Sequence, residues 1–66
     1  MNKQINKGDR VHQVALVGLA AIPNDPYVVG VYPDGIEISS EPDGEPRTDI
    51  NNQPRHYPPH KFLRIS

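Results

Sequence analysis

The chain has 66 residues, of which 35% are hydrophobic and 23% are charged, with no cysteine and a formal net charge of −1. This length allows a single domain, residues 1–66, with a small core, and the absence of cysteine excludes disulfides and thiolate metal sites. The balanced charge argues against nucleic-acid binding, and no apolar run reaches the roughly 20 residues that span a bilayer. We therefore expect a cytoplasmic protein, and the low apolar content leaves a homo-oligomer open.

The polar residues 1–7 predict a flexible N-terminus. A first strand is expected after Gly8, where residues 9–14 alternate polar and apolar side chains. Residues 14–22 are then almost all apolar, and periodicity does not distinguish a buried strand from a short helix there. The β-branched residues in this run favour an extended path with at most one helical turn, and the run is a candidate oligomer interface.

Prolines and glycines divide the rest of the chain into strand-length pieces. Eight prolines, the first at position 23, exclude a long helix beyond residue 22. Residues 27–32 are rich in β-branched and aromatic side chains and form the clearest strand. The triplet Pro33-Asp34-Gly35 predicts a tight turn into a second strand over residues 35–39. Tyr32 and Phe62 are expected in the core, because few other bulky side chains are available.

Residues 40–54 predict a long polar loop, in which Ile50 is the only large apolar residue and is expected to pin the loop to the domain. A short strand over residues 55–57, a 3₁₀ turn over 58–60 and a final strand over 62–65 complete the chain. The prediction is therefore an all-β protein, a small barrel of about five strands with a 3₁₀ turn before the last strand.

The order of these elements resembles an SH3-like β-barrel. Short blocks also resemble the plasmid-encoded type II dihydrofolate reductases, which are tetramers of such barrels around one pore: Gly8-Asp9-Arg10-Val11, Val29-Gly30 with Tyr32, and Tyr57-Pro58 with Arg64-Ile65. The pore motif Gln-Ile-Tyr of that family corresponds here to Arg55-His56-Tyr57, and Gln13 stands where the family has a lysine. The resemblance implies the fold and one alternative function, a homo-oligomeric barrel that binds a small ligand in a shared pore.

The sequence contains no recognisable catalytic motif. No serine lies in a nucleophile motif, and no glycine-rich phosphate loop is present. His56 and His60 have the spacing of metal ligands on a helix, but Pro58 and Pro59 exclude that helix. We therefore predict no enzyme, no catalytic, cofactor-binding or metal-ligating residue, and no cofactor. The histidines, with His12, are candidates for pH-sensitive binding.

The leading hypothesis is a non-catalytic protein-interaction module, an accessory or regulatory protein that docks on a larger protein partner. Tyrosine gives a large contact area at low entropic cost, and Tyr57 is the best surface candidate. The alternative to a core position for Tyr32 is an aromatic–proline surface, of the kind that binds extended proline-rich peptides in SH3-like barrels, formed by Tyr27, Tyr32, Tyr57, Pro33, Pro58 and Pro59. An acidic loop suits a basic partner. The predicted partner-binding residues are Arg55, His56, Tyr57, Glu41, Asp43, Glu45 and Asp49. A nucleic-acid-binding barrel is the second alternative.

Overall fold

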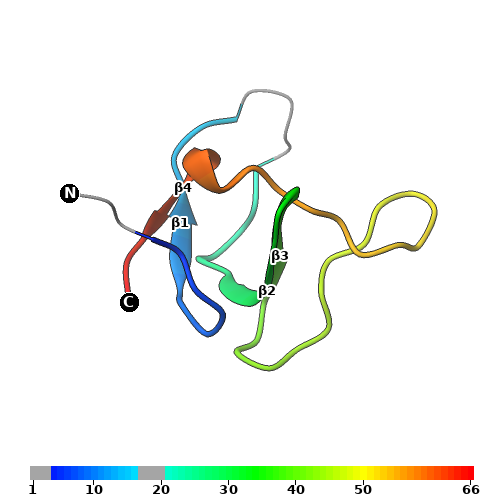
Figure 1. Cartoon of the computed structure of the whole chain (residues 1–66), viewed down its shortest axis with the longest axis horizontal. Helices are drawn as coiled ribbons and strands as arrows, with labels where there is room; N and C mark the ends of the chain where they lie inside the picture. Colours follow the sequence, from blue (N-terminus) through cyan, green and yellow to red (C-terminus); the bar gives the residue numbers. More distant parts are fainter. Residues whose placement is uncertain (1–3, 17–20) are drawn as a thin grey trace.

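The computed structural model describes residues 4–16 and 21–66 of the chain (Figure 1). Its strands are β1 (Val11–Gln13), β2 (Tyr27–Tyr32), β3 (Gly35–Ser39) and β4 (Phe62–Arg64), and a 3₁₀ turn, η1 (Pro59–Lys61), lies directly before β4. Strand β1 pairs with β4, and β2 pairs with β3, both antiparallel. The described residues form no α-helix, so the predictions of an all-β chain and of a 3₁₀ turn before the last strand are confirmed.

Strands β2 and β3 form the hairpin that the turn residues predict. Gly35 follows the turn with a φ of +146°, a conformation that favours glycine. A Cβ atom at this position would lie 2.8 Å from the carbonyl oxygen of Tyr57 and 3.1 Å from the Cβ of His56. Glycine at position 35 therefore lets the backbone of residues 56–57 approach the hairpin closely.

A register shift in β2 decides which side chains share a face of the hairpin. Val28 opposes Ile38, but the next paired residues are Gly30 and Glu37, so β2 has one extra residue between them. A bulge of this kind moves the following side chains to the other face. Val28 thus shares the core face with Ile38, whereas Gly30 and Tyr32 lie on the face of Glu37.

Isolated bridges connect the two strand pairs to each other and to the segment before η1. Arg10 bridges to Tyr27, which joins the start of β1 to the start of β2. Ile36 bridges to Tyr57 through two backbone hydrogen bonds of 2.9 and 2.8 Å, which brings the segment before η1 against β3. The pairings therefore connect β4, β1, β2, β3 and Tyr57 in that order.

The described residues form four strands rather than the predicted five, and two two-stranded sheets rather than a closed barrel. The difference lies in the predicted strand over residues 55–57, of which only Tyr57 pairs as a single bridge. Pro54, Pro58 and Pro59 flank this segment and have no N–H to donate to a neighbouring strand, so the pairing cannot extend beyond it.

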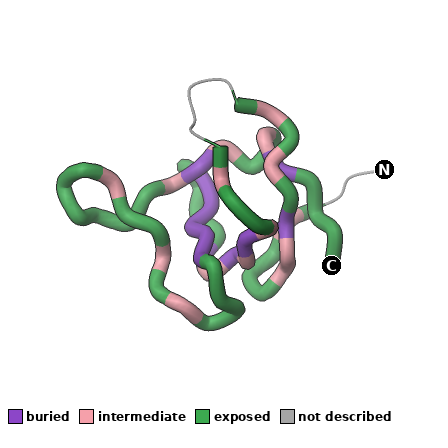
Figure 2. Tube along the Cα trace, turned by 180° about the vertical axis from the view of Figure 1, so that it is seen from behind, coloured by how far each residue is buried: buried purple, intermediate pink, exposed green. Residues whose placement is uncertain are grey.

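The core is small, and every strand contributes to it. Figure 2 shows the buried residues gathered at the centre of the molecule. Ile5 and Ile22 pack partly against this core. The rings of Tyr57 and Phe62 meet edge to face with centroids 6.0 Å apart. The buried apolar residues are Val11, Val28, Ile36, Ile38, Tyr57 and Phe62.

Phe62 lies in the core as predicted, but Tyr32 is exposed where a core position was expected, and Tyr57 is buried where a surface position was expected. Tyr32 is 46% exposed, because the bulge in β2 turns it to the face opposite the core. Tyr57 is only 5% exposed, because its bridge to Ile36 places its ring on the core side. The predicted core role of Tyr32 and the predicted surface role of the Tyr57 ring are therefore both corrected.

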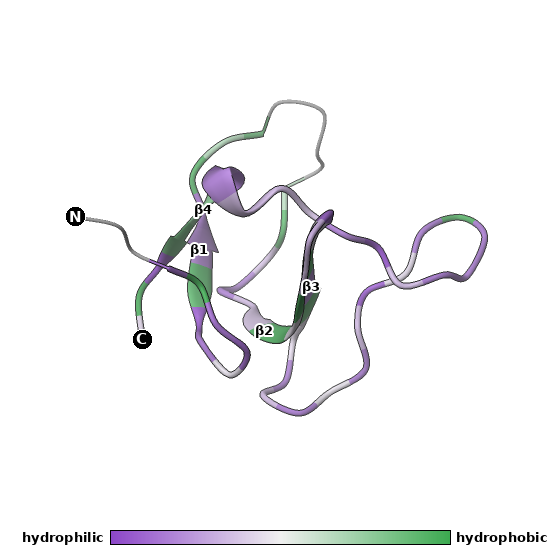
Figure 3. Ribbon diagram, in the orientation of Figure 1, coloured by the Kyte–Doolittle hydropathy of each residue, from purple (hydrophilic) through white to green (hydrophobic). Residues whose placement is uncertain are grey.

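Residues 40–58 contain no named strand or helix and extend to one side of the molecule (Figure 1). A bridge between Thr48 and Pro54 closes the outer part of this segment. Ile50 lies within that outer part and is 98% exposed, so the expectation that it pins the loop to the domain is wrong. Figure 3 shows a short hydrophobic stretch in the outer part of this otherwise polar loop.

The path of residues 14–22 is described only at its two ends. Residues 14–16 and 21–22 belong to no strand or helix, and residues 17–20 lie outside the described residues. Across residues 4–16 and 21–66, no helix has the length and apolar character needed to cross a bilayer.

Candidate functional site

An open groove of about 410 Å³ lies between the end of the β2–β3 hairpin and η1. Two buried side chains, Ile36 and Phe62, form part of its lining, whereas Val31 and Tyr32 are about half exposed. The groove thus offers an apolar floor and an aromatic wall to solvent. Its lining residues are Gln4, Ile5, Val31, Tyr32, Ile36, Pro59, His60 and Phe62.

A cluster of polar side chains stands beside Tyr32 on the outer face of the hairpin. We call it the His56 cluster; it consists of His56, Asp34 and Glu37. The bridge between Ile36 and Tyr57 positions it, because continuing that antiparallel register places His56 opposite Glu37.

Both ring nitrogens of His56 contact a carboxylate. Nδ1 lies 2.6 Å from Oδ1 of Asp34, and Nε2 lies 3.0 Å from Oε2 of Glu37. The Asp34 side chain is 73% exposed, whereas the Glu37 side chain is only 12% exposed. An ionised carboxylate accepts hydrogen bonds and does not donate them, so two such contacts require an N–H on each nitrogen. This geometry therefore suits the imidazolium form of His56.

The same two contacts raise the pKa of His56. The hydrogen bond to Asp34 has the largest effect, the hydrogen bond to Glu37 follows, and partial desolvation of the ring opposes them. Both hydrogen bonds are stronger with a charged donor, which is why they favour the protonated ring.

Stacking joins the His56 cluster to the groove. The imidazole ring lies parallel to the phenol ring of Tyr32, with centroids 4.8 Å apart and an angle of 6° between the planes. Tyr32 also lines the groove. One face of the Tyr32 side chain is therefore held by His56, a residue that is 24 positions away in the sequence (56 − 32 = 24).

Gly30 makes room for this arrangement. A Cβ atom at position 30 would lie 2.7 Å from Cε1 of Tyr32 and 2.9 Å from Oε1 of Glu37. Both side chains thus close over the bare backbone of β2 at this point. Any larger residue at position 30 requires them to move.

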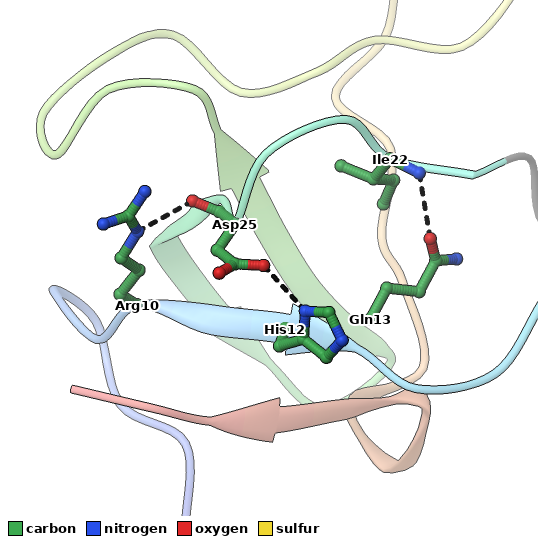
Figure 4. A network of polar contacts seen from close by, with 5 residues as sticks. All are labelled: Arg10, His12, Gln13, Ile22 and Asp25. Atoms are coloured by element: carbon green, nitrogen blue, oxygen red, sulfur yellow. Dashed lines mark hydrogen bonds and ion pairs between the residues drawn. The ribbon is translucent and has the colours of Figure 1, made fainter.

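A second polar network, drawn in Figure 4, holds the segment before β2 against β1. The Nε of Arg10 donates to the backbone carbonyl of Asp25 at 3.0 Å, and Nδ1 of His12 lies 2.7 Å from the Asp25 carboxylate. The backbone N–H of Ile22 donates to Oε1 of Gln13 at 2.9 Å. Two of these three contacts satisfy backbone groups of the loop, so we assign this network to the fold.

The predicted partner-binding residues 55–57 point in different directions. Arg55 is exposed, and its guanidinium lies 5.4 Å from the centroid of the Tyr57 ring. Tyr57 is buried, and its hydroxyl accepts a hydrogen bond of 3.3 Å from Nε of Arg47. His56 contacts the groove wall, because its ring stacks on that of Tyr32.

The predicted acidic residues lie in the loop that follows β3. Glu41, Asp43 and Glu45 are exposed. The Asp49 carboxylate accepts hydrogen bonds from the backbone N–H groups of Asn51 and Gln53, so it shapes its own turn. Within residues 4–16 and 21–66, no group of histidine and acidic side chains, the His56 cluster included, has an arrangement that could hold a metal ion.

Sequence reasoning missed most of the groove. Tyr32 and Pro59 belong to the alternative aromatic–proline surface, but nothing in the sequence signals a binding role for Val31. The local pattern indicates only a turn position for Asp34 and a polar position in an alternating strand for Glu37. Their link to His56 spans 22 and 19 residues of sequence, and no local pattern predicts such a pairing.

Comparisons with protein-family models, with curated proteins and with solved structures found no match to this chain.

Proposed function

We propose that the chain is a small, non-catalytic protein-interaction module of the SH3-like type, which binds an extended apolar or proline-rich segment of a larger partner. The observation that carries this proposal is the open groove with an exposed aromatic wall, Tyr32, and an apolar floor, Ile36 and Phe62. Proline-rich segments are already extended in solution and dock on aromatic-lined grooves with little loss of entropy.

The lining of the groove supports binding rather than chemistry. Among the described residues, the lining includes no carboxylate, lysine or arginine, and His60 supplies the only imidazole. General acid–base catalysis needs titratable groups that converge on a reacting atom, and nucleophilic catalysis needs a nucleophile beside a base. An apolar groove with few polar groups suits instead a ligand that buries apolar side chains.

The SH3-like fold is part of the proposal. The bridge between Arg10 and Tyr27 joins the two strand pairs, so that the four strands follow one another in the order β4, β1, β2, β3. The bridge between Ile36 and Tyr57 adds the segment before η1 to the outer side of β3. The 3₁₀ turn η1 then returns the chain from Tyr57 to β4. This connectivity supports a partly open small barrel, in which the groove lies between the β2–β3 hairpin at one end of the strand order and η1 with β4 at the other.

Titration with a blocked polyproline peptide of about eight residues tests the proposal. In the polyproline II conformation such a peptide spans ~25 Å, comparable to the 25 Å width of the molecule. Amide chemical shifts should change at Val31, Tyr32, His60 and Phe62, and Tyr32→Ala should weaken binding about tenfold, or ~1.4 kcal/mol. Leu63→Ala is the matched control, because Leu63 is similarly exposed but does not line the groove. Equal losses in both variants, or shifts elsewhere, would disprove the groove assignment.

The acidic loop remains a proposed secondary contact for basic residues of the partner. Glu41, Asp43 and Glu45 are exposed and form no ion pair with another described residue. Replacing the three by lysine should reduce the affinity for a polyproline peptide extended with arginines, and leave the unextended peptide unaffected. An unchanged affinity for the arginine-bearing peptide would remove the loop from the interface.

Self-association is the second candidate, and a different observation favours it. Four large apolar side chains on or beside the β1–β4 pair are between 44% and 58% exposed: Val14, Leu16, Leu63 and Ile65. Burial of such side chains between two copies is favourable at about 25 cal/mol per Å² of apolar surface. Multi-angle light scattering should then show a dimer or larger species, which Leu63→Lys should dissociate. A strict monomer at high concentration would exclude this candidate.

A further inference from the structure

The groove wall and a titratable side chain are in direct contact. His56 stacks on Tyr32 and also contacts Asp34 and Glu37 through its two ring nitrogens. Its ring is thus fixed on three sides, by the turn that follows β2, by β3 and by the phenol. A change in the charge of this one ring acts on all three contacts at once.

Loss of one proton from His56 breaks the symmetry of these contacts. The neutral imidazole has a single N–H, so it donates to Asp34 or to Glu37 but not to both. The remaining pair brings a nitrogen lone pair against a carboxylate oxygen, which is repulsive at 2.6 or 3.0 Å. The favourable attraction between a cationic ring and the face of Tyr32 is lost as well. The neutral ring therefore has reason to leave its present position.

We propose that the His56 cluster is a proton-dependent clamp on the groove, in which the imidazolium holds Tyr32 as the groove wall and deprotonation releases Tyr32 and weakens partner binding. The effect on binding rests on the proposed function of the groove, whereas the coupling of Tyr32 to His56 does not. Glu37 is the member whose contact changes most, because its side chain is 12% exposed and has little water to replace a lost hydrogen bond.

Among the described residues, few charged groups lie near His56. Asp34 faces it from the turn and Glu37 faces it from β3, and both attract the imidazolium. From β2 it meets the uncharged phenol of Tyr32. Its own segment contributes Arg55, whose guanidinium is directed over the ring of Tyr57. The two carboxylates raise the pKa of His56, so the cluster keeps its proton to a higher pH than a free imidazole does.

A pH titration of the free protein by NMR tests the clamp without any ligand. The ring resonances of Tyr32 should shift with the same midpoint as those of His56. Glu37→Gln and His56→Gln should each abolish the transition of Tyr32, whereas His12→Gln, which affects the separate contact with Asp25, should leave it unchanged. Two variants are used because either alone can disturb folding. Tyr32 resonances that do not follow the titration of His56 would overturn the proposal.

A second titration separates the clamp from the function of the groove. The blocked polyproline peptide carries no ionisable group, so any pH dependence of its binding comes from the protein. Its dissociation constant should rise about fivefold to tenfold as the pH passes through the His56 midpoint, and this rise should vanish in His56→Gln. Binding that is equally tight above and below the midpoint would overturn the proposal that protonation of His56 controls binding in the groove. An absence of binding at every pH, with Tyr32 still following His56, would overturn the proposed function and support the clamp.

Discussion

His56 lies flat on Tyr32, with the two ring planes 6° from parallel, although a turn, strand β3 and a long loop separate the two residues in the sequence. The contact exists because the bulge in β2 and the bridge at Tyr57 bring both rings to the same face of the hairpin. An exposed tyrosine normally has rotamer freedom to lose on binding a partner. Here that freedom is already restricted by the stacked imidazole.

The protonation of His56 should make the stability of the fold depend on pH. Because the pKa of His56 is raised in the folded state, the folded chain binds the proton more tightly than the unfolded chain does. This contribution to stability is therefore complete below the unfolded-state pKa of about 6.5, and it is lost as the pH rises through the folded-state pKa. Urea unfolding of the wild type and His56→Gln should show a larger difference near pH 6 than near pH 9. The control is His60→Gln, because no described carboxylate pairs with His60. A difference that grows towards high pH would contradict the assignment.

Gly30→Ala should impair the groove while the protein stays folded. The new Cβ atom would lie 2.7 Å from Cε1 of Tyr32 and 2.9 Å from Oε1 of Glu37, and both are ends of side chains that can move. Replacing a strand glycine by alanine otherwise stabilises by roughly 0.5–1 kcal/mol, so we expect little net change in the free energy of unfolding. The affinity for the polyproline peptide should fall several-fold, as measured by chemical-shift titration. Gly8→Ala, at a φ of +96° with open space around the new atom, is the control, and it should lose stability but not affinity.

Tyr57 should contribute to stability mainly through its ring. Removing the hydroxyl in Tyr57→Phe deletes the hydrogen bond from Arg47 and should cost about 1 kcal/mol. Removing the ring in Tyr57→Ala should cost about 3–5 kcal/mol, which is a large part of the stability that a chain of this size has. Denaturant unfolding followed by far-UV circular dichroism measures both values. A loss in Tyr57→Ala no larger than in Tyr57→Phe would show that the ring is not in the core.

Ile50→Ser should leave the fold unaffected. The side chain is 98% exposed, and surface substitutions of this kind usually change the free energy of unfolding by less than about 0.5 kcal/mol. Ile38→Val, at a fully buried position, should cost about 0.5–1.5 kcal/mol in the same assay and serves as the comparison. A destabilisation by Ile50→Ser that equals the effect of Ile38→Val would mean that the loop packs on the domain.

Local sequence patterns predicted the parts of the fold that depend on local chemistry. The hairpin follows from the Pro33-Asp34-Gly35 turn between two β-branched runs, and the 3₁₀ turn follows from Pro58 and Pro59 before an apolar strand. These features depend on residues that are neighbours in the chain.

The groove and the His56 cluster depend instead on register, which local patterns do not encode. One extra residue between Val28 and Gly30 is enough to move Tyr32 from the core face to the outer face. The pairing of Tyr57 with Ile36 joins segments 21 residues apart (57 − 36 = 21), and it decides that Tyr57 is buried and that His56 meets Glu37. Neither pairing leaves a trace in composition or periodicity.

The pairing of β1 with β4 joins residues 11–13 to residues 62–64, and the paired residues lie 49 to 53 positions apart in the sequence (62 − 13 = 49 and 64 − 11 = 53). During synthesis, β1 therefore has no partner until the last residues of this segment have left the ribosomal exit tunnel. The β2–β3 hairpin can form earlier, but an isolated hairpin is marginally stable in water. Folding of this domain should thus be completed only after residues 62–64 have emerged, and a nascent chain that stalls before residue 62 should remain accessible to proteases and chaperones.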